Sequence, residues 1–256
     1  MNIRETAKLT PNYFEINREE RNYAAILFAA LCKRENAEKF LHYCGYDTEL
    51  GPDFGIYVEY AYLRDLWSKI DDEQVKKEII RRHLKISRID EILDQPIVDI
   101  NRTFGAAGRP SVEFVQNPGK WAITKYDENF PITEDFVKIC RFKWSFNIKP
   151  DIVIHLEKDR AICIEAKYES GEGTYPASGK EKAIFRKRGI PYVGQMELQK
   201  YMMEELLGIH TDFLFLVSRK KKSATHKVVG WAEAFNCLDL TDLPSFAAEM
   251  VRRISA

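Results

Sequence analysis

Apolar and polar positions alternate along two neighbouring segments in the second half of the chain, "DIVIHLE" and "RAICIEAKY". An alternation with a period of two predicts β-strands, because successive side chains of a strand point to opposite faces of a sheet. The residues "EKDR" where the two segments meet are polar and few enough for a hairpin turn. The two strands are therefore expected to pair antiparallel.

A helical spacing of apolar residues marks the segment 17–34, "NREERNYAAILFAALCKR". Asn17 suits the N-cap, and Lys33 with Arg34 suits the C-terminal end, where the helix dipole favours basic side chains. Glu20 falls on or beside the apolar stripe formed with Tyr23, Leu27 and their neighbours. An acid in this position is unusual for a helix that packs on a core.

The rest of the chain changes from helical to strand-like patterns and back. We expect helices over "FGIYVEYAYLRDLWSKI" and "DEQVKKEIIRRHLKISRIDEIL", then a connection rich in Pro and Gly over residues 96–111. Further expected elements are the strands "SVEFVQ", "KWAITKYD", "DFLFLVS" and "KVVGWAEAF", and the helices "YVGQMELQKYMMEELLG" and "LPSFAAEMVRRI". This order predicts a layered domain of the α/β or α+β class.

Composition and charge exclude several classes of protein. The 256 residues carry 39 basic and 39 acidic side chains, so global charge indicates no partner, and any polyanion site must be local. No apolar run approaches the roughly 20 residues of a membrane-spanning helix, and the first residues lack the apolar centre of a secretory signal. The five cysteines are odd in number and scattered, which favours neither disulfides nor a zinc site. We expect a cytoplasmic protein without membrane contact.

Three charged residues on the predicted hairpin suggest its chemistry. Asp151 begins the first strand, and Glu165 and Lys167 project from one face near the end of the second, so the two carboxylates are expected to converge at the open end of the hairpin. Such oxygen ligands, completed by the backbone carbonyl of Ala166 and by water, suit Mg²⁺ or Mn²⁺. The metal would activate a water for phosphodiester hydrolysis, and the Lys167 ammonium would orient that water or neutralise charge on phosphorus.

Pro150-Asp151, a short hairpin and Glu165-Ala166-Lys167 resemble the PD-(D/E)XK nuclease superfamily over roughly residues 113–232 and the first helix. The resemblance implies a restriction-endonuclease-like αβββαβ core, with segments divided as 1–39 for the first core helix, 40–111 for a helical insertion and 112–256 for the nuclease core. It also implies a metal-dependent DNA endonuclease, of the kind that acts in prokaryotic (antiviral) defence or DNA processing.

The same resemblance assigns supporting roles outside the hairpin. An acid on the first core helix often joins the metal site in this superfamily, and Glu20 corresponds to it, with Glu19 as the alternative. RecB-like members carry Gln-x-x-x-Tyr on the helix after the motif strands. Here Gln195 is followed by Gln199, and the tyrosine is displaced to Tyr201. Gln195 is thus a candidate for positioning the phosphate, Lys167 or the water.

Two basic segments border the predicted site in sequence and are candidates for nucleic-acid binding, with solvated loops as the alternative. The residues concerned are Lys180, Lys182, Arg186, Lys187, Arg188, Lys220 and Lys221. Residues 40–100 combine many aromatic side chains with few basic ones over "DFGIYVEYAYLRDLW", which favours contact with a second copy or another protein.

Other interpretations of the same residues stay open. Glu165 and Lys167 can form an ordinary cross-strand ion pair, and Asp151 can be a strand-entry residue after Pro150. A nuclease-like core without turnover would serve as a nucleic-acid-binding or assembly module. An RNA-cleaving nuclease is the third alternative, since no reader of the 2′-hydroxyl group is recognisable.

Overall fold

The computed structural model describes residues 6–9, 11–105, 117–126, 128–168, 171–217 and 226–255. The chain forms two compact units. The sheet unit comprises Met1–Glu59, Asp151–Gly171 and Asp212–Ala256, and the helical unit comprises Tyr60–Pro150 and Glu172–Thr211. This division falls at other positions than the three predicted segments, because residues 40–59 join the sheet unit and residues 117–150 join the helical one.

A five-stranded sheet in the order β1-β2-β3-β6-β7 forms the centre of the sheet unit. Its strands are β1 (Gly55–Val58), β2 (Ile152–Glu157), β3 (Arg160–Lys167), β6 (His210–Val217) and β7 (Lys227–Gly230). The hairpin of β2 and β3 pairs antiparallel with Ile152 opposite Ile164, which confirms the predicted hairpin. β1 adds an antiparallel edge strand to β2, and β7 pairs parallel with β6. The chain is therefore of the α+β class.

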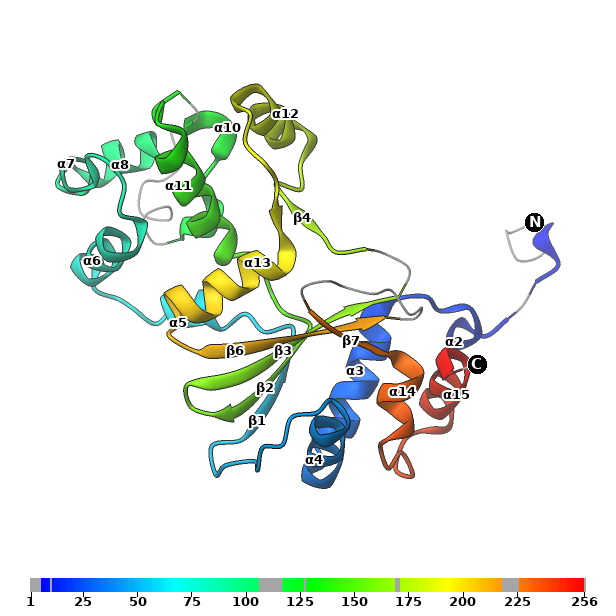
Figure 1. The fold of residues 1–256 in the computed structure, drawn as a ribbon. Coiled ribbons are helices and arrows are strands. Elements are labelled where there is room, and N and C mark those ends of the chain that lie inside the picture. The colour runs from blue at the N-terminus through cyan, green and yellow to red at the C-terminus, as the bar shows by residue number, and fades with distance from the viewer. Residues whose placement is uncertain are drawn as a thin grey trace. The chain divides into compact units, whose positions relative to one another are not determined.

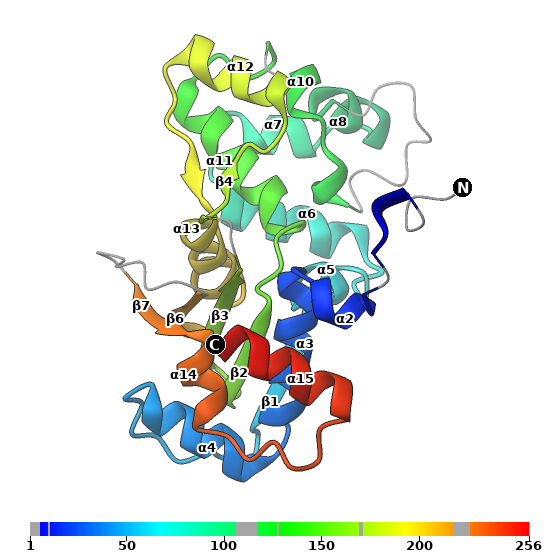
Figure 2. The same ribbon diagram turned by 90° about the vertical axis from the view of Figure 1, so that its right-hand side faces the viewer.

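Helices cover one face of this sheet (Figures 1 and 2). They are α3 (Glu20–Leu31), α4 (Arg34–Tyr43), α14 (Trp231–Asn236) and α15 (Ser245–Ser255). The even-numbered residues of the hairpin, such as Ile154 and Ile164, lie fully buried with Leu27 of α3 and Phe40 of α4 in one hydrophobic core. Burying such side chains contributes about 1.5 to 3 kcal/mol each. The odd-numbered hairpin residues point to the other face of the sheet, because successive side chains of a strand alternate between the two faces. Asp151, Glu165 and Lys167 are among them.

The helical unit is built from short helices around aromatic side chains. In chain order these are α5 (Tyr62–Trp67), α6 (Glu73–Leu84), α7 (Ile89–Leu93), α8 (Ile97–Thr103), a 3₁₀ turn (Pro118–Lys120), α10 (Ile123–Tyr126), α11 (Thr133–Ser145), α12 (Gly179–Arg188) and α13 (Gln195–Lys200), which continues as a π-helical turn (Tyr201–Leu206). A small ribbon of β4 (Thr174–Tyr175) and β5 (Val193–Gly194) precedes α13. Phe104 stacks on Trp121 with ring centroids 4.0 Å apart.

Several predicted elements are wrong in type or extent. Residues 54–70 were expected to be one helix, but Gly55–Val58 pairs with β2 as a strand before α5 begins. The expected strand "KWAITKYD" is a 3₁₀ turn followed by α10, because Trp121 and Tyr126 pack into the aromatic cluster. The strand expected over "KVVGWAEAF" ends at Gly230, where the Glu233 carboxylate accepts from the Gly230 N–H and begins α14.

The limits of the first helix also differ from the expectation. α3 begins at Glu20, and the Asn17 side chain accepts from the Glu19 N–H instead of capping the helix directly. Lys33 and Arg34 start α4. The predicted strand "SVEFVQ" and the basic residues Lys220 and Lys221 lie outside the described residues.

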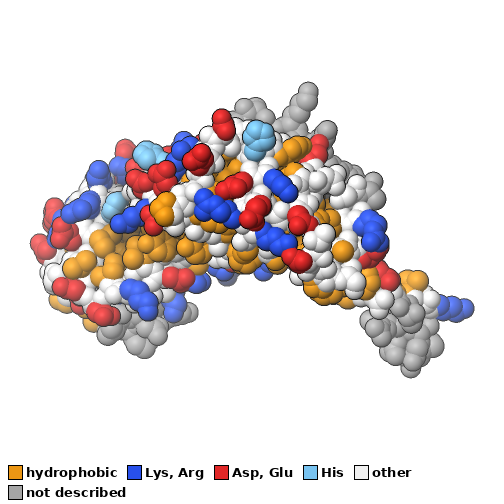
Figure 3. All heavy atoms as spheres, turned by 90° about the horizontal axis from the view of Figure 1, so that it is seen from below, with side chains coloured by type: hydrophobic (Ala, Val, Ile, Leu, Met, Phe, Trp, Pro, Cys, Tyr) orange, Lys and Arg blue, Asp and Glu red, His pale blue; other side chains and the backbone are white. Residues whose placement is uncertain are grey.

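Charged side chains of both signs are interspersed on the face shown in Figure 3, in keeping with a net charge of zero. Within the described ranges, no helix is long and apolar enough to cross a membrane.

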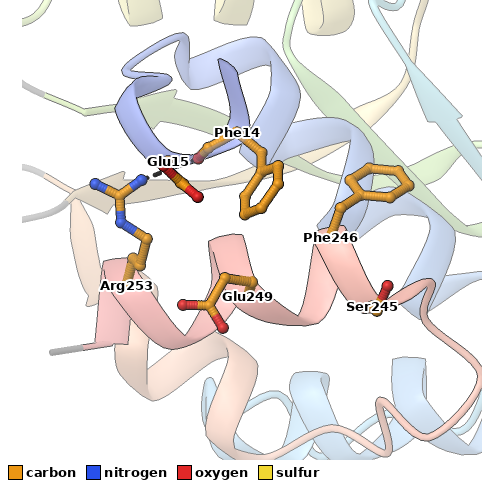
Figure 4. Close-up of a pocket in the computed structure, with 6 residues that line it drawn as sticks. All are labelled: Phe14, Glu15, Ser245, Phe246, Glu249 and Arg253. Atoms are coloured by element: carbon orange, nitrogen blue, oxygen red, sulfur yellow. Dashed lines mark hydrogen bonds between the residues drawn. The ribbon is translucent and has the colours of Figure 1, made fainter. Parts of the chain in front are cut away.

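An open groove of about 640 Å³ lies between α15 and the short helix α2 (Tyr13–Ile16) of the sheet unit (Figure 4). Arg253 donates to the backbone carbonyl of Phe14 at 2.9 Å and so ties the two helices together. Phe14 and Phe246 contribute the aromatic part of its lining.

Candidate functional site

The open end of the β2–β3 hairpin brings the predicted acids together. The register pairs Ile152 with Ile164, so extending it by one residue places Asp151 opposite Glu165. Asp151 Oδ2 accepts from the Ala166 N–H at 2.7 Å, which fixes the carboxylate against β3. The predicted convergence of the two strand ends follows directly from this antiparallel pairing.

Lys167 lies among the carboxylates. Its Nζ is 2.5 Å from Glu165 Oε1 and 3.8 Å from Glu20 Oε1. Glu165 is 1% exposed and Lys167 is 8% exposed, so this ion pair is buried and differs from the solvated surface pair that was the alternative interpretation. Two carboxylates thus lie within 3.8 Å of the Lys167 ammonium, and the charge of Asp151 also acts on it.

The pKa values of Asp151 and Lys167 are both shifted in this cluster, which consists of Asp151, Glu165, Lys167 and Glu20. Burial, and then the neighbouring Glu165 carboxylate, raise the pKa of Asp151 from 3.8 to about 7, against the opposing hydrogen bond from Ala166 and the charge of Lys167. Burial lowers the pKa of Lys167, but attraction and hydrogen bonding by Glu165 outweigh it, and the pKa is raised overall. Lys167 is therefore an ammonium donor at neutral pH and cannot act as a base there.

Glu20 approaches the cluster from the N-terminal end of α3. Its Oε2 accepts from the Tyr168 N–H at 3.3 Å, while its Oε1 faces Lys167. An acid beside the apolar stripe of this helix thus has partners at the end of β3. Its contacts are with Lys167 and the backbone, and a role as metal ligand stays a prediction.

Trp231 contacts the backbone of Lys167, but it was not predicted from the sequence as a site residue. Its indole Nε1–H donates to the Lys167 carbonyl at 3.1 Å, and its ring lies 6.0 Å from that of Tyr23, which stacks on Tyr168 at 5.3 Å. These aromatic side chains hold the backbone on which Lys167 sits. Lys167 and Trp231 are 64 positions apart in the chain, and no sequence pattern indicates this contact.

Gln195 belongs to the helical unit. Its Oε1 accepts from the Gly173 N–H at 3.2 Å, and Glu172 accepts from the Met196 N–H at 3.0 Å. A Cβ on Gly173 would lie 2.6 Å from the Gln195 carboxamide oxygen, so a side chain at this position would displace the end of Gln195. Gln195 thus helps to fix the start of α13, and its proposed approach to the carboxylates stays a prediction.

The donor set can be tested for its fit to a divalent cation. Among the described residues, no group of three or more His, Cys, Asp or Glu side chains is arranged to hold a metal ion. The hairpin offers two carboxylates, Asp151 and Glu165. The pKa of Asp151 is raised first by burial and then by the charge of Glu165, and a cation would offset the second of these effects. Mg²⁺ commonly binds through one or two carboxylates and keeps several waters, so this pair fits it.

Five basic residues of the predicted nucleic-acid interface lie on α12. Lys180, Arg186 and Lys187 are exposed. Lys182 lies 5.8 Å from the centre of the Tyr192 ring. Arg188 donates to the Phe130 carbonyl at 3.0 Å and stacks on Phe136, so its guanidinium has a structural role within the helical unit.

Metal-free stability should depend on pH through Asp151. Because its folded pKa is raised, its contribution to stability is fully present below pH 3.8 and is lost as the pH rises through about 7. Asp151→Asn removes this titration while keeping an acceptor for the Ala166 N–H. The difference in unfolding free energy, Asp151→Asn minus wild type, should therefore increase from about pH 4 to about pH 7 and then stay constant.

Urea unfolding in EDTA across this pH range measures the difference. Asp159→Asn, at the exposed hairpin turn, is the matched control and should show no such trend. A constant difference between Asp151→Asn and wild type would show that Asp151 titrates normally.

No family model matches the sequence, no curated protein is significantly similar to it, and no solved structure matches the fold. Function must therefore be argued from the residues and geometry of this chain.

Proposed function

We propose that the chain is a metal-dependent nuclease that hydrolyses phosphodiester bonds of DNA at the open end of the β2–β3 hairpin. The observation that carries this proposal is the cluster of half-buried Asp151 with buried Glu165 and Lys167, in which burial and the Glu165 carboxylate raise the pKa of Asp151. Clusters of mutually perturbed titratable groups gather at functional sites.

The order of elements supports the superfamily resemblance as part of this proposal. In chain order, α3 and α4 are followed by β1, by the residues 60–150 of the helical unit, and by the hairpin of β2 and β3. After β4, α12 and β5 come α13 and β6. The proposal takes α3, β1, β2, β3, α13 and β6 as the αβββαβ core that the resemblance implies, with the other elements as insertions. A place in prokaryotic defence or DNA processing, and DNA rather than RNA as substrate, are proposed from the same resemblance.

Each residue of the cluster has a distinct proposed task. A divalent cation held by Asp151 and Glu165, with the Ala166 carbonyl and water, would polarise the phosphodiester and make a bound water a better nucleophile. Asp151 must lose its proton to bind the cation, which its pKa of about 7 permits at neutral pH. Lys167 stays protonated and offers its ammonium to the developing charge on the phosphate. Trp231 fixes the backbone beneath it.

A direct comparison of substrates tests the proposal. Purified protein should cleave linear or plasmid DNA with Mg²⁺ or Mn²⁺ and should leave it intact in EDTA. Single-stranded DNA and RNA, assayed under the same conditions, identify the class of substrate. Faster cleavage of RNA than of DNA would identify the chain as a ribonuclease. Metal binding without cleavage of any of these would instead support the inert nucleic-acid-binding or assembly module.

The exposed basic residues of α12 give a second expected result. Replacing Lys180, Arg186 and Lys187 together by glutamine should weaken DNA binding, because fewer counterions are released from the phosphates. The slope of log affinity against log salt should flatten by about 2 to 3 units. Arg188 is kept because it packs within the unit.

Fluorescence anisotropy in EDTA, over a range of salt concentrations, measures this slope without cleavage. The matched control neutralises Lys158 and Arg160, which are exposed at the hairpin turn. An unchanged slope in the α12 variant would assign these side chains to an ordinary solvated surface.

A further inference from the structure

A cavity of about 510 Å³ lies within the helical unit, away from the residues assigned above. Its wall is formed by the C-terminal end of α6, by α11, and by α13 with the π-helical turn that follows, elements that can be followed in Figure 1. π-Helical turns are rare and frequently occur at functional sites. The volume falls in the range of small-molecule sites, about 300 to 1,000 Å³.

Arg141 is the central donor of this cavity. Its guanidinium lies 4.9 Å from the centre of the Tyr201 ring, and its Nη2 is 3.4 Å from Glu197 Oε1. Its Nε is buried and makes no hydrogen bond within the described structure. The Arg141 side chain as a whole is 31% exposed and lines the cavity, so the guanidinium is accessible to a ligand there.

Basic side chains gather beside Arg141. Lys138 Nζ is 3.3 Å from the backbone carbonyl of Lys85, so both lysines lie on the same wall, and it also pairs with Glu134 at 2.7 Å. Lys200, on the π-helical side of the cavity, lies 3.7 Å from Glu204. Burial, with the charges of Arg82 and Lys85, lowers the pKa of His83, so the imidazole adds no charge at neutral pH. The positive charge of the cavity comes from Lys and Arg alone.

Carboxylates and a phenol complete the lining. Glu197, Glu204 and Glu205 offer acceptors, and Tyr201 has its pKa raised to about 12 by burial, so its hydroxyl stays neutral. Glu197 and Glu204 already pair with Arg141 and Lys200, and a simple anion would leave most of the cavity volume unused. A fitting ligand carries negative charge, hydrogen-bond donors and a flat apolar surface together.

We propose that this cavity binds a nucleoside phosphate. The phosphate groups would accept from Arg141, Lys85 and Lys138, the sugar hydroxyls or base amino groups would donate to the carboxylates, and the base would lie beside Tyr201. The inference rests on the geometry of the helical unit alone and does not depend on the nuclease proposal.

Isothermal calorimetry on the full chain in EDTA tests this site, with AMP, ADP, ATP and inorganic phosphate as the titrants. EDTA removes divalent cations, so a nucleotide cannot be held through a metal at Asp151. At least one nucleotide should bind about tenfold or more tightly than inorganic phosphate. Arg141→Met and, at the exposed rim, Lys85→Met should each weaken that binding by about tenfold.

Arg82→Met is the matched control. Arg82 is next to the lining residue His83 in the chain, but its side chain pairs with Glu78 and is exposed. The nucleotide affinity of this variant should equal that of wild type. The Lys85 variant changes only an exposed side chain, so a folding defect in the Arg141 variant leaves the test intact. Equal binding of inorganic phosphate and nucleotides would reduce the cavity to an adventitious anion site. No heat at about 1 mM nucleotide, or wild-type affinity in both variants, would overturn the proposal.

Discussion

Replacing Glu165 by glutamine should reduce DNA cleavage by a factor on the order of 10³ or more. Glu165 is 1% exposed and pairs with Lys167 at 2.5 Å, so it provides a buried charge at the centre of the cluster. Glutamine has the same shape and still accepts a hydrogen bond from Lys167, but it removes the charge that a divalent cation needs. The loss should therefore fall on turnover, with the fold preserved.

A matched variant and a folding measurement isolate this effect. Glu157→Gln lies on β2 of the same hairpin, exposed at the turn end, and should keep the wild-type rate. Far-UV circular dichroism and thermal unfolding of both variants check that the sheet unit is intact. Wild-type cleavage by a folded Glu165→Gln protein would remove the hairpin from the proposed mechanism.

Lys167→Met should lower the rate of cleavage by a factor on the order of 10² and should raise the affinity for Mn²⁺ several-fold. The rate falls because the ammonium no longer meets the developing charge on the phosphate. The metal affinity rises because Lys167 occupies Glu165 in the metal-free protein and competes with a cation for the same oxygen. Methionine keeps the apolar stem of a side chain that is 8% exposed.

The opposite changes in rate and affinity distinguish this role from a structural one. If Lys167 only held the hairpin together, metal affinity and activity would fall together and the melting temperature with them. Lys158→Met, at the exposed hairpin turn, controls for the loss of one positive charge.

The hairpin could be predicted from sequence because its information is local. Alternation over residues 151–157 and 160–167 determines which side chains share a face, and the antiparallel hairpin brings residues 151 and 165 to its open end. The register that places Asp151 opposite Glu165 also depends on an irregularity between His155 and Glu157, which the sequence pattern does not predict. The position of Lys167 follows from the same alternation. Glu20 was found as an acid beside an apolar stripe, and its contacts with Lys167 and Tyr168 give that position a physical reason.

Features that depend on distant partners could not be predicted in the same way. β1 pairs with β2 as an antiparallel edge strand. Its Ile56, Tyr57 and Val58 favour a strand, but they are few and lie within a longer segment whose pattern predicts a helix. α11 (Thr133–Ser145) buries Phe136 and Trp144 in the aromatic cluster of the helical unit, and its pattern was not recognised. The Trp231 hydrogen bond to Lys167 joins residues on separate elements, which no periodicity encodes.

Calorimetric titration of Mn²⁺ into wild-type protein and into the Glu165→Gln variant, at about pH 8, tests most directly whether Asp151 and Glu165 bind a divalent cation. At this pH Asp151 is largely ionised, since its pKa is about 7. A metal centre at Asp151 and Glu165 predicts a single class of Mn²⁺ site in the wild type and at least a tenfold loss of Mn²⁺ affinity in the variant. Equal affinity in the two proteins, or no binding by the wild type, would contradict a metal centre at Asp151 and Glu165.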